Sequence, residues 1–246
     1  MTLRGGTVHT SSQYRQVADS SLHCNKSNMR IVILGGTGSS GILLIEEALA
    51  AKHIIVVYAR NPQKLPAHLS KHQDITIVKG ELEDSKALDT AFASADAVLS
   101  ALGPSFRHPS GTPLARGYTA VLDAMRRQGV KRLIALGTPS IKDEQNDKPS
   151  VVYRAMVTAV WFGASSAYKD IVAVGEVIQA CEDIDWTIVR VPVLNNDKNR
   201  EVLAGYIGDG GAGARYTLAR LGFAVFVLRE LEEREWIRKA PLITSA

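Results

Sequence analysis

RIVILGGTGSSG, residues 30–41, joins a run of apolar residues to a loop that contains four glycines. A short apolar run that ends in glycine is typical of a strand buried on both faces of a parallel sheet. Apolar residues then recur at helical spacing over Ile42–Ala51. The stretch therefore predicts a strand, a glycine loop and a helix, in that order.

The same alternation of strand and helix continues along the chain. Further buried strands are predicted at His53–Ala59, Ile75–Val78, Ala97–Ala101, Arg132–Leu136 and Trp186–Val191. Further helices are predicted at Ser85–Ala93, Tyr118–Gln128, Val151–Phe162, Ile171–Cys181 and Thr217–Glu233. Strands that alternate with helices indicate βαβ units with right-handed crossovers. We predict an α/β fold, a Rossmann-type doubly wound parallel sheet in a single domain over residues 29–246, with small substrate-binding elements near the C-terminus.

The glycine loop fits the pattern G-x-G-x-x-G where a dinucleotide site needs it, between the first strand and the first helix. Gly36 permits a tight turn, Gly38 lets the backbone approach a pyrophosphate, and Gly41 lets the helix pack closely on the sheet. Amides at the start of a helix attract phosphate, and two hydroxyl side chains add donors. The alternative is a purely structural turn. The predicted pyrophosphate-binding residues are Gly35, Gly36, Thr37, Gly38, Ser39 and Gly41.

The residue at the end of the second predicted strand distinguishes the two nicotinamide dinucleotides. A site that prefers NAD has Asp or Glu there, to accept from the ribose 2′-hydroxyl. This chain has Arg60, whose guanidinium can form a forked, charge-assisted pair with a 2′-phosphate. A charged hydrogen bond of about 1.5–3 kcal/mol corresponds to a preference of about 10- to 150-fold. The sequence thus predicts NADP(H) as the cofactor, the alternative being that Arg60 is a solvated strand end.

With these residues in place, the chain from residue 29 to residue 246 resembles the NmrA-like group of atypical short-chain dehydrogenases/reductases, close to the biliverdin reductase B and flavin reductase type. Six segments carry the resemblance: Gly35–Gly41, Ala59–Pro62, Lys79–Asp84, Val98–Gly103, Gly129–Ile134 and Asp185–Arg190. Together they are specific for the group and not for a substrate.

The resemblance also implies roles for single residues. Glu81 and Leu82 would flank the adenine, where the group usually has Asp-Leu. Thr138 would lie beside the nicotinamide, at the end of the fifth strand. The residues implied to line the ribose and nicotinamide, and to back the nicotinamide ring, are Ala101, Leu102, Gly103, Val191, Pro192 and Val193.

The usual proton relay of short-chain dehydrogenases is missing. That relay pairs a Tyr with a Lys four residues later, which lowers the pKa of the phenol. None of the seven Tyr residues has Lys at that position. The catalytic candidates that remain are Thr138 and Tyr153, which lies 13 residues after Ser140. Tyr153 is interpreted either as a neutral proton donor or as a packing residue, and Thr138 either as a group that polarises a substrate oxygen or as a turn cap.

Other side chains leave alternatives open. His108 is either a functional group near the nicotinamide or a loop histidine. His68 and His72 have i,i+4 spacing but no third ligand, so no metal site is predicted. Trp161, Phe162 and Tyr168 (the predicted aromatic cluster) either cover an aromatic substrate or belong to the core.

Composition narrows the class of partner. The net charge is +4, and Lys and Arg are scattered rather than clustered, which suits an anionic cofactor better than nucleic acid. Apolar runs fall short of the roughly 20 residues that span a bilayer. Two cysteines imply no disulfide framework and favour a reducing, cytoplasmic setting. We expect a small-molecule substrate, no nucleic-acid or membrane partner, and a monomer or homodimer.

Residues 1–28 differ in composition from the rest of the chain. They are rich in Ser and Thr and contain one acidic residue, Asp19. Such a segment buries too little apolar surface to offset the entropy of ordering it. It is interpreted as a disordered tail, an upstream extension before Met29, or a leader such as a transit peptide.

The leading hypothesis for function is an NADPH-dependent oxidoreductase that transfers hydride to a conjugated carbonyl, quinone or flavin-like molecule, such as a tailoring enzyme of secondary metabolism. Enzymes of the biliverdin reductase B type work without the Tyr-Lys pair, because hydride transfer is the cofactor's own chemistry. Two alternatives remain: a non-catalytic sensor of NADP, and an isomerase or dehydratase that retains the cofactor.

Overall fold

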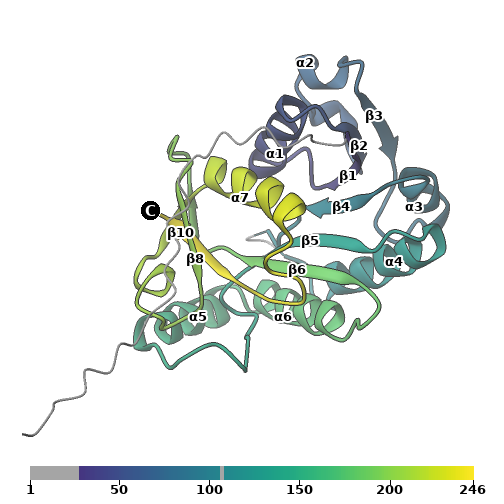
Figure 1. Ribbon diagram of the computed structural model, residues 1–246. Helices are drawn as coiled ribbons and strands as arrows, with labels where there is room; N and C mark the ends of the chain where they lie inside the picture. Colours follow the sequence, from purple (N-terminus) through teal and green to yellow (C-terminus); the bar gives the residue numbers. More distant parts are fainter. Residues whose placement is uncertain (1–27, 106–107) are drawn as a thin grey trace, which may run out of the picture.

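The computed structural model describes residues 28–105 and 108–246. Figure 1 shows a central twisted sheet with helices on both faces. Its strands are β1 (Arg30–Leu34), β2 (Ile54–Ala59), β3 (Ile75–Lys79), β4 (Ala97–Ser100), β5 (Arg132–Gly137), β6 (Asp185–Arg190), β8 (Val202–Gly205) and β10 (Leu242–Ser245). Their spatial order is β3-β2-β1-β4-β5-β6-β10-β8, and only β8 runs antiparallel to its neighbour. The strand order reverses between β1 and β4, which is where an open α/β sheet binds its ligand.

The helices form one layer on each side of the sheet (Figure 1). Their bounds are α1 (Ser39–Ala50), α2 (Ala67–Ser70), α3 (Ser85–Phe92), α4 (Pro113–Gln128), α5 (Val151–Gly163), α6 (Ser165–Gln179) and α7 (Arg220–Glu233), with short 3-10 turns at Pro62–Lys64 and Ala212–Ala214. Helices α3, α4 and α6 pack on one face, and α1 and α7 on the other. In the described chain no helix has both the length and the apolar character needed to cross a membrane.

Strand β1 explains why the sheet is covered on both sides. Val32 and Leu34 point into the core beneath α3, α4 and α6, whereas Ile31 and Ile33 point into the core beneath α1 and α7. All four side chains are fully buried. Because side chains alternate between the two faces of a strand, an unbroken apolar run requires a hydrophobic layer on each face. The predicted Rossmann-type sheet is therefore confirmed.

The predicted elements differ from the structure mainly near the C-terminus. The helix predicted to begin at Thr217 begins at Arg220, because Thr217–Ala219 forms β9, which pairs with β7 (Val193–Asn195) in a separate two-stranded sheet. Strands β7, β8 and β10 and the short helix α2 were not predicted. The predicted leader, residues 1–28, lies outside the described residues except for Asn28.

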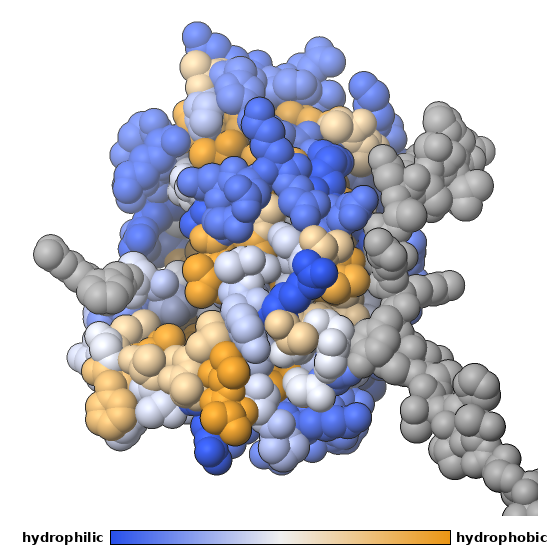
Figure 2. All heavy atoms as spheres, turned by 90° about the vertical axis from the view of Figure 1, so that its left-hand side faces the viewer, coloured by the Kyte–Doolittle hydropathy of each residue, from blue (hydrophilic) through white to orange (hydrophobic). Residues whose placement is uncertain are grey.

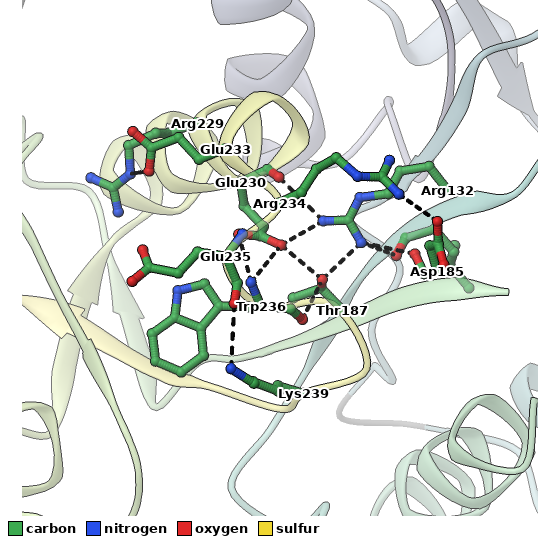
Figure 3. A network of polar contacts seen from close by, with 11 residues as sticks. Arg132, Asp185, Thr187, Arg229, Glu230, Glu233, Arg234, Glu235, Trp236 and Lys239 are labelled. Atoms are coloured by element: carbon green, nitrogen blue, oxygen red, sulfur yellow. Dashed lines mark hydrogen bonds and ion pairs between the residues drawn. The ribbon is translucent and has the colours of Figure 1, made fainter. Parts of the chain in front are cut away.

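A buried ion pair ties β5 to α7 (Figure 3). Arg132 Nη2 donates to Glu230 Oε1 over 2.6 Å, and both side chains are almost fully buried. The same carboxylate accepts from the Thr187 hydroxyl and the Trp236 amide. Burial lowers the pKa of Arg132 to about 10, although Glu230 acts in the opposite direction. Arg132 is the first residue of β5, so this network lies at the amino ends of the strands. Open α/β sheets bind their ligands at the opposite, carboxyl ends, so the network stabilises the fold and is not part of a ligand site.

Replacing Glu230 by Ala should lower the free energy of unfolding by about 3–5 kcal/mol, since it leaves the Arg132 charge buried and unpaired. Glu233→Ala is the matched control on the same helix. Its ion pair with Arg229 spans 3.4 Å with the carboxylate 55% exposed, so its loss should cost less than about 0.5 kcal/mol. Urea unfolding followed by circular dichroism measures both values. Equal losses in the two variants would contradict a special role for the buried pair.

Candidate nucleotide site

The glycine loop after β1 is packed too tightly for side chains. A Cβ on Gly41 would lie 2.2 Å from the carbonyl oxygen of Gly35. Gly35 has a φ of +74°, and a Cβ there would meet the backbone of Ala101 at 3.0 Å. Helix α1 begins directly after Gly38, and in the described chain no side chain caps its first turn. The loop therefore brings uncapped amides close to the end of β4, an arrangement suited to an anion.

A cavity of about 430 Å³ opens at the carboxyl ends of the first four strands. Its walls come from the loops that follow β1, β2, β3 and β4, and from the start of α4. Seven of the predicted cofactor residues line it: Gly35, Thr37, Arg60, Glu81, Leu82, Leu102 and Gly103. Gly36 and Gly41 are buried in the same glycine loop, where they allow the turn to pack closely against neighbouring groups. The cavity thus gathers residues from four separate parts of the sequence.

Arg60 and Glu81 lie at the exposed rim of this cavity. Arg60 Nε is 3.9 Å from Glu81 Oε2, and the two side chains are 71% and 69% exposed. An ion pair this long and this exposed contributes little to stability. The Arg60 guanidinium is therefore only loosely held by its neighbour, and a bound phosphate could replace the carboxylate as its partner.

Tyr58 forms a fixed wall of the cavity between β2 and β3. Its hydroxyl donates to the Glu81 carbonyl over 2.5 Å, and a Cβ on Gly80 would lie 2.3 Å from that hydroxyl oxygen. Burial, followed by the charges of Asp84 and Glu81, raises the pKa of Tyr58 to about 12. The phenol is therefore protonated at neutral pH, and it fixes the backbone that carries Glu81.

His108 and Asp170 form a pair that sequence analysis only half identified. His108 Nε2 lies 2.5 Å from Asp170 Oδ2, with 10% of the imidazole and none of the carboxylate exposed. Asp170, on α6, also accepts from the amides of Leu114 and Ala115 in the first turn of α4, each over 2.8 Å. The carboxylate thus caps α4 from another helix and holds His108 in the cavity wall. No local pattern marks Asp170, because its partners are 55–62 residues away.

Of the residues predicted to lie around the nicotinamide, Leu102 and Gly103 line the cavity, whereas those at the ends of β5 and β6 do not. Thr138 follows β5, and the Val191 amide donates to the Gly137 carbonyl over 3.0 Å, so the two strand ends are adjacent. The Thr138 hydroxyl accepts from the Ser140 amide over 3.3 Å, as in a turn cap. Its two predicted roles are compatible, since a hydroxyl that accepts from an amide can still donate.

A second buried ion pair supports this end of the sheet. Arg190, the last residue of β6, is fully buried, and its guanidinium donates to both carboxylate oxygens of Asp147 over 2.5 and 2.8 Å. It also donates to the carbonyl of Ile141 over 3.0 Å, while Asp147 accepts from the amide of Ile207 over 3.0 Å. The loop after β5 and the segment after β8 are therefore held against the end of β6, next to Thr138.

Tyr153 is buried on the inner face of α5, with 2% of its surface exposed. Its hydroxyl donates to the Arg215 carbonyl over 2.6 Å, and its ring lies 5.5 Å from that of Tyr216. Burial, more than the neighbouring Tyr216, raises the pKa of Tyr153 above its usual value. This geometry matches the packing interpretation, since the phenolic proton is already donated to a backbone oxygen.

The remaining candidates are dispersed. Trp161 and Phe162 contact each other at 4.5 Å between ring centroids, but they are 45% and 76% exposed, so the core interpretation is wrong for both. His68 hydrogen-bonds Glu46, and His72 accepts from the amide of Asp74. Within residues 28–105 and 108–246 no group of three or more His, Cys, Asp or Glu side chains could hold a metal ion.

Comparisons with known proteins agree with this geometry. A family model described as NAD(P)H-binding matches residues 35–234. A curated relative, isoeugenol synthase 1 of Clarkia breweri, is 26% identical over 113 residues, and the match covers 43% of this chain. The chain spans only 33% of the length of that relative.

Solved structures share the fold at low sequence identity. A short-chain dehydrogenase/reductase of Veillonella parvula in complex with NADP superposes with a TM-score of 0.71 and 18% identity, over 89% of this chain and 95% of that chain. An oxidoreductase of Lactococcus lactis gives a TM-score of 0.69 and 16% identity, over 89% and 91% of the two chains. At such identities the likeness shows a common fold alone.

Replacing Gly41 by Ala should weaken the binding of NADPH at least about tenfold, because the new Cβ displaces the Gly35 carbonyl and the amides beside it. Gly163→Ala is the control, since a Cβ there meets nothing within 4 Å. Titration of NADPH fluorescence measures affinity, and thermal unfolding verifies the fold. Unchanged affinity in a folded Gly41→Ala variant would show that the loop does not hold the phosphates.

Proposed function

The chain belongs to the NAD(P)H-binding family, and from this membership we propose that it is an NADPH-dependent oxidoreductase that passes hydride to a conjugated carbonyl, quinone or flavin-like molecule. One observation carries the proposal. A single cavity is lined by the glycine loop through Gly35 and Thr37, and by Arg60 at the end of β2. It thus combines an anion site for a pyrophosphate with a cation for a 2′-phosphate.

The residues present fit such a cofactor. Any larger side chain at Gly41 would collide with the Gly35 carbonyl, so glycine there keeps the tight turn that lies next to the uncapped helix amides. The first turn of α1 contains no carboxylate that would repel phosphate. The group would supply the hydride when bound. Gly38 and Thr37 would hold its phosphates, Leu82 would contact its adenine, and Leu102 and Thr138 would lie near the nicotinamide.

The preference for NADPH depends on two charged side chains at the rim of the cavity, Arg60 and Glu81, which act in opposite directions on a 2′-phosphate. Arg60 attracts a 2′-phosphate, whereas Glu81, 3.9 Å away, repels it and competes for the same guanidinium. Arg–carboxylate and Arg–phosphate pairs are both charge-assisted, but the pair with Glu81 is long and both of its side chains are largely exposed, which weakens it. A phosphate with up to two charges therefore outcompetes one solvated carboxylate, and Arg60 binds the nucleotide that carries it.

The Tyr153 phenol is not free to donate a proton to a substrate, and this restricts the acceptor. Hydride transfer to a simple ketone produces a strongly basic alkoxide, which needs an acid at the site. In a conjugated carbonyl, a quinone or a flavin the charge is delocalised and is neutralised by water. Because the Tyr153 hydroxyl is committed to Arg215, acceptors of the second kind are favoured. The name of the isoeugenol synthase relative also points to a conjugated aromatic molecule, and a tailoring role in secondary metabolism would suit such substrates.

A non-catalytic sensor of NADP is the second candidate, and the same observation at Tyr153 favours it. A sensor would bind NADPH without oxidising it in the presence of any acceptor. A panel of quinones, FMN and conjugated carbonyls separates the two candidates, because a reductase consumes NADPH with at least one of them. Turnover of a substrate without net loss of NADPH would indicate an isomerase instead.

Replacing Arg60 by Ala should remove a preference for NADPH over NADH of about 10- to 150-fold while leaving NADH affinity unchanged. Glu81→Gln is the matched variant at the other end of the pair. It should strengthen NADPH binding by at most about threefold, because both groups are solvated. Fluorescence titration of the wild type and both variants with each nucleotide measures the six affinities. Equal weakening of NADH and NADPH by Arg60→Ala would mean that Arg60 does not contact the 2′-phosphate.

With the best acceptor of that panel, Thr138→Val should lower kcat about 10- to 100-fold without changing NADPH affinity, since it removes one donor to the substrate oxygen. Tyr153→Phe should keep kcat within about threefold and lower the free energy of unfolding by about 1 kcal/mol, through loss of the bond to Arg215. Single-turnover oxidation of NADPH and urea unfolding measure the two effects. A large loss of kcat in Tyr153→Phe would make this phenol the proton donor.

A further inference from the structure

His108 and Asp170 make a contact in the cavity wall that the capping of α4 does not require. The two oxygens of Asp170 already accept from the amides of Leu114 and Ala115 at the start of that helix. The imidazole adds a third donor, over 2.5 Å, to a carboxylate that is fully buried. Because His108 also lines the nucleotide cavity, this arrangement presents a fixed imidazole to the ligand that the cavity binds.

The bond to Asp170 determines which nitrogen of His108 a ligand can use. A carboxylate only accepts, so Nε2 of the imidazole carries a hydrogen and donates it. In the part of the chain that the structure describes, Nδ1 has no hydrogen-bond partner. Nδ1 is an acceptor in the neutral ring and a second donor in the protonated ring. The hydrogen bond that His108 offers to a ligand therefore depends on its protonation.

The burial of Asp170 favours the protonated form of that ring. Among the described residues His108 is the one ion-pair partner of this carboxylate. A buried charge is costly unless an opposite charge lies beside it. An imidazolium at His108 supplies that charge, and its Nδ1–H is then available to an anion in the cavity. Arg60, at the exposed rim, is the other basic side chain in the described lining.

The imidazole and the glycine loop belong to the same cavity. Gly35 and Thr37 line it together with His108. Gly35 also packs against the backbone of Ala101 and Leu102, where the loop after β4 begins. The glycine loop itself contains no Lys or Arg. We propose that His108, as the imidazolium, donates through Nδ1 to the pyrophosphate of the bound dinucleotide, so that the cofactor binds together with a proton. This inference rests on the proposed function only in that the dinucleotide occupies this cavity.

Other parts of a dinucleotide would bind this nitrogen differently. A ribose hydroxyl can donate to the neutral ring or accept from the protonated ring, so it gives no strong dependence on protonation. Pyrophosphate only accepts, so it binds the protonated ring and not the neutral one. The uptake of a proton on binding therefore distinguishes pyrophosphate from a ribose as the partner of His108.

The outer side of α5 is a less suitable surface for an anion. Figure 1 places α5 at the lower left, and in Figure 2 hydrophobic residues gather on the lower part of that side, below a hydrophilic upper part. Of the 13 residues of α5 only Arg154 is charged. The cavity, with its loop amides and His108, therefore suits the phosphates better.

The groups around His108 differ in how they respond to pH. Besides His108, the titratable side chains that line the cavity or pair with its lining are Tyr58, Arg60, Glu81, Glu83, Arg116 and Asp170. Carboxylates and guanidinium groups keep their charge between about pH 6 and pH 9. Burial raises the pKa of Tyr58 to about 12, so this phenol stays neutral there. Histidine is the residue type of this set that titrates near neutral pH, so proton uptake on binding reports on His108.

The test measures the protons that the full chain takes up when it binds NADH. NADH is the probe because it lacks the 2′-phosphate, a group that itself titrates near neutral pH. Calorimetric titrations at about pH 7.5, in buffers of different ionisation enthalpy, give the number of protons per NADH bound. We expect uptake of up to about one proton, and an NADH affinity that falls at least about tenfold between about pH 6 and pH 9.

Two histidine variants make the result specific. His108→Gln keeps a donor for Asp170 but cannot be protonated, so it should abolish proton uptake. It should weaken NADH binding about 10- to 150-fold at about pH 6 and by less than about threefold at about pH 9. His68→Gln is the matched control, since His68 pairs with Glu46 over 3.1 Å outside the cavity and is 63% exposed. It should change neither quantity, and thermal unfolding verifies that both variants are folded.

Several outcomes would overturn the proposal. They are no uptake or a release of protons by the wild type, whatever the variants do, and uptake that persists in folded His108→Gln or is lost equally in His68→Gln. Failure of the folded wild type to bind NADH would overturn it as well. No acceptor is present, so the result is independent of hydride transfer. A protein that binds NADH with a proton but oxidises NADPH with no acceptor would keep this inference and lose the proposed reductase function.

Discussion

The contact between Gly41 and the carbonyl of Gly35 is the constraint on which the site depends. Helix α1 reaches the loop so closely that a Cβ at Gly41 would overlap the carbonyl oxygen. Gly35 in turn lies against the backbone at Ala101, beyond the end of β4. Two glycines thus hold the first helix, the first strand and the fourth strand in one arrangement. The amides of α1, and the cavity walls that Thr37 and Leu102 provide, take their positions from it.

The two buried arginines, Arg132 and Arg190, lie at opposite ends of the sheet. The first stabilises the fold, and the second lies beside the proposed site. Arg132 lies at the amino end of β5, where its bond to Glu230 joins two strands to α7. Arg190 lies at the carboxyl end of β6, where its bond to Asp147 fixes the loops around Thr138. Taking a charge out of water is costly unless its partner is well placed. Both sites offset that cost with hydrogen bonds to backbone groups, and only the second borders the proposed chemistry.

Local patterns in the sequence predict the sheet and most of the cavity walls, whereas contacts between residues far apart in the chain leave no such pattern. The apolar run at residues 30–34 and the glycine loop have periodic or positional signals, so the sheet and most of the cavity walls follow from them. Strand β10 has only four residues and no helix before it to mark a βαβ unit, and β9 was absorbed into the helix that follows it. Asp170 was missed because its contacts with His108 and α4 cross more than 50 residues. Tyr153 has the right spacing for catalysis, but a packing contact with Tyr216 decides its environment.

Tyr153 also connects α5 to the strands that follow the end of β6. Its ring lies on the inner face of α5, and its hydroxyl holds the carbonyl of Arg215, two residues before β9. Strand β9 pairs with β7, which directly follows the end of β6 at Pro192. Tyr153 therefore ties α5 to the segment that follows β6 through one hydrogen bond and one strand pair, which gives the side chain at this position a structural role.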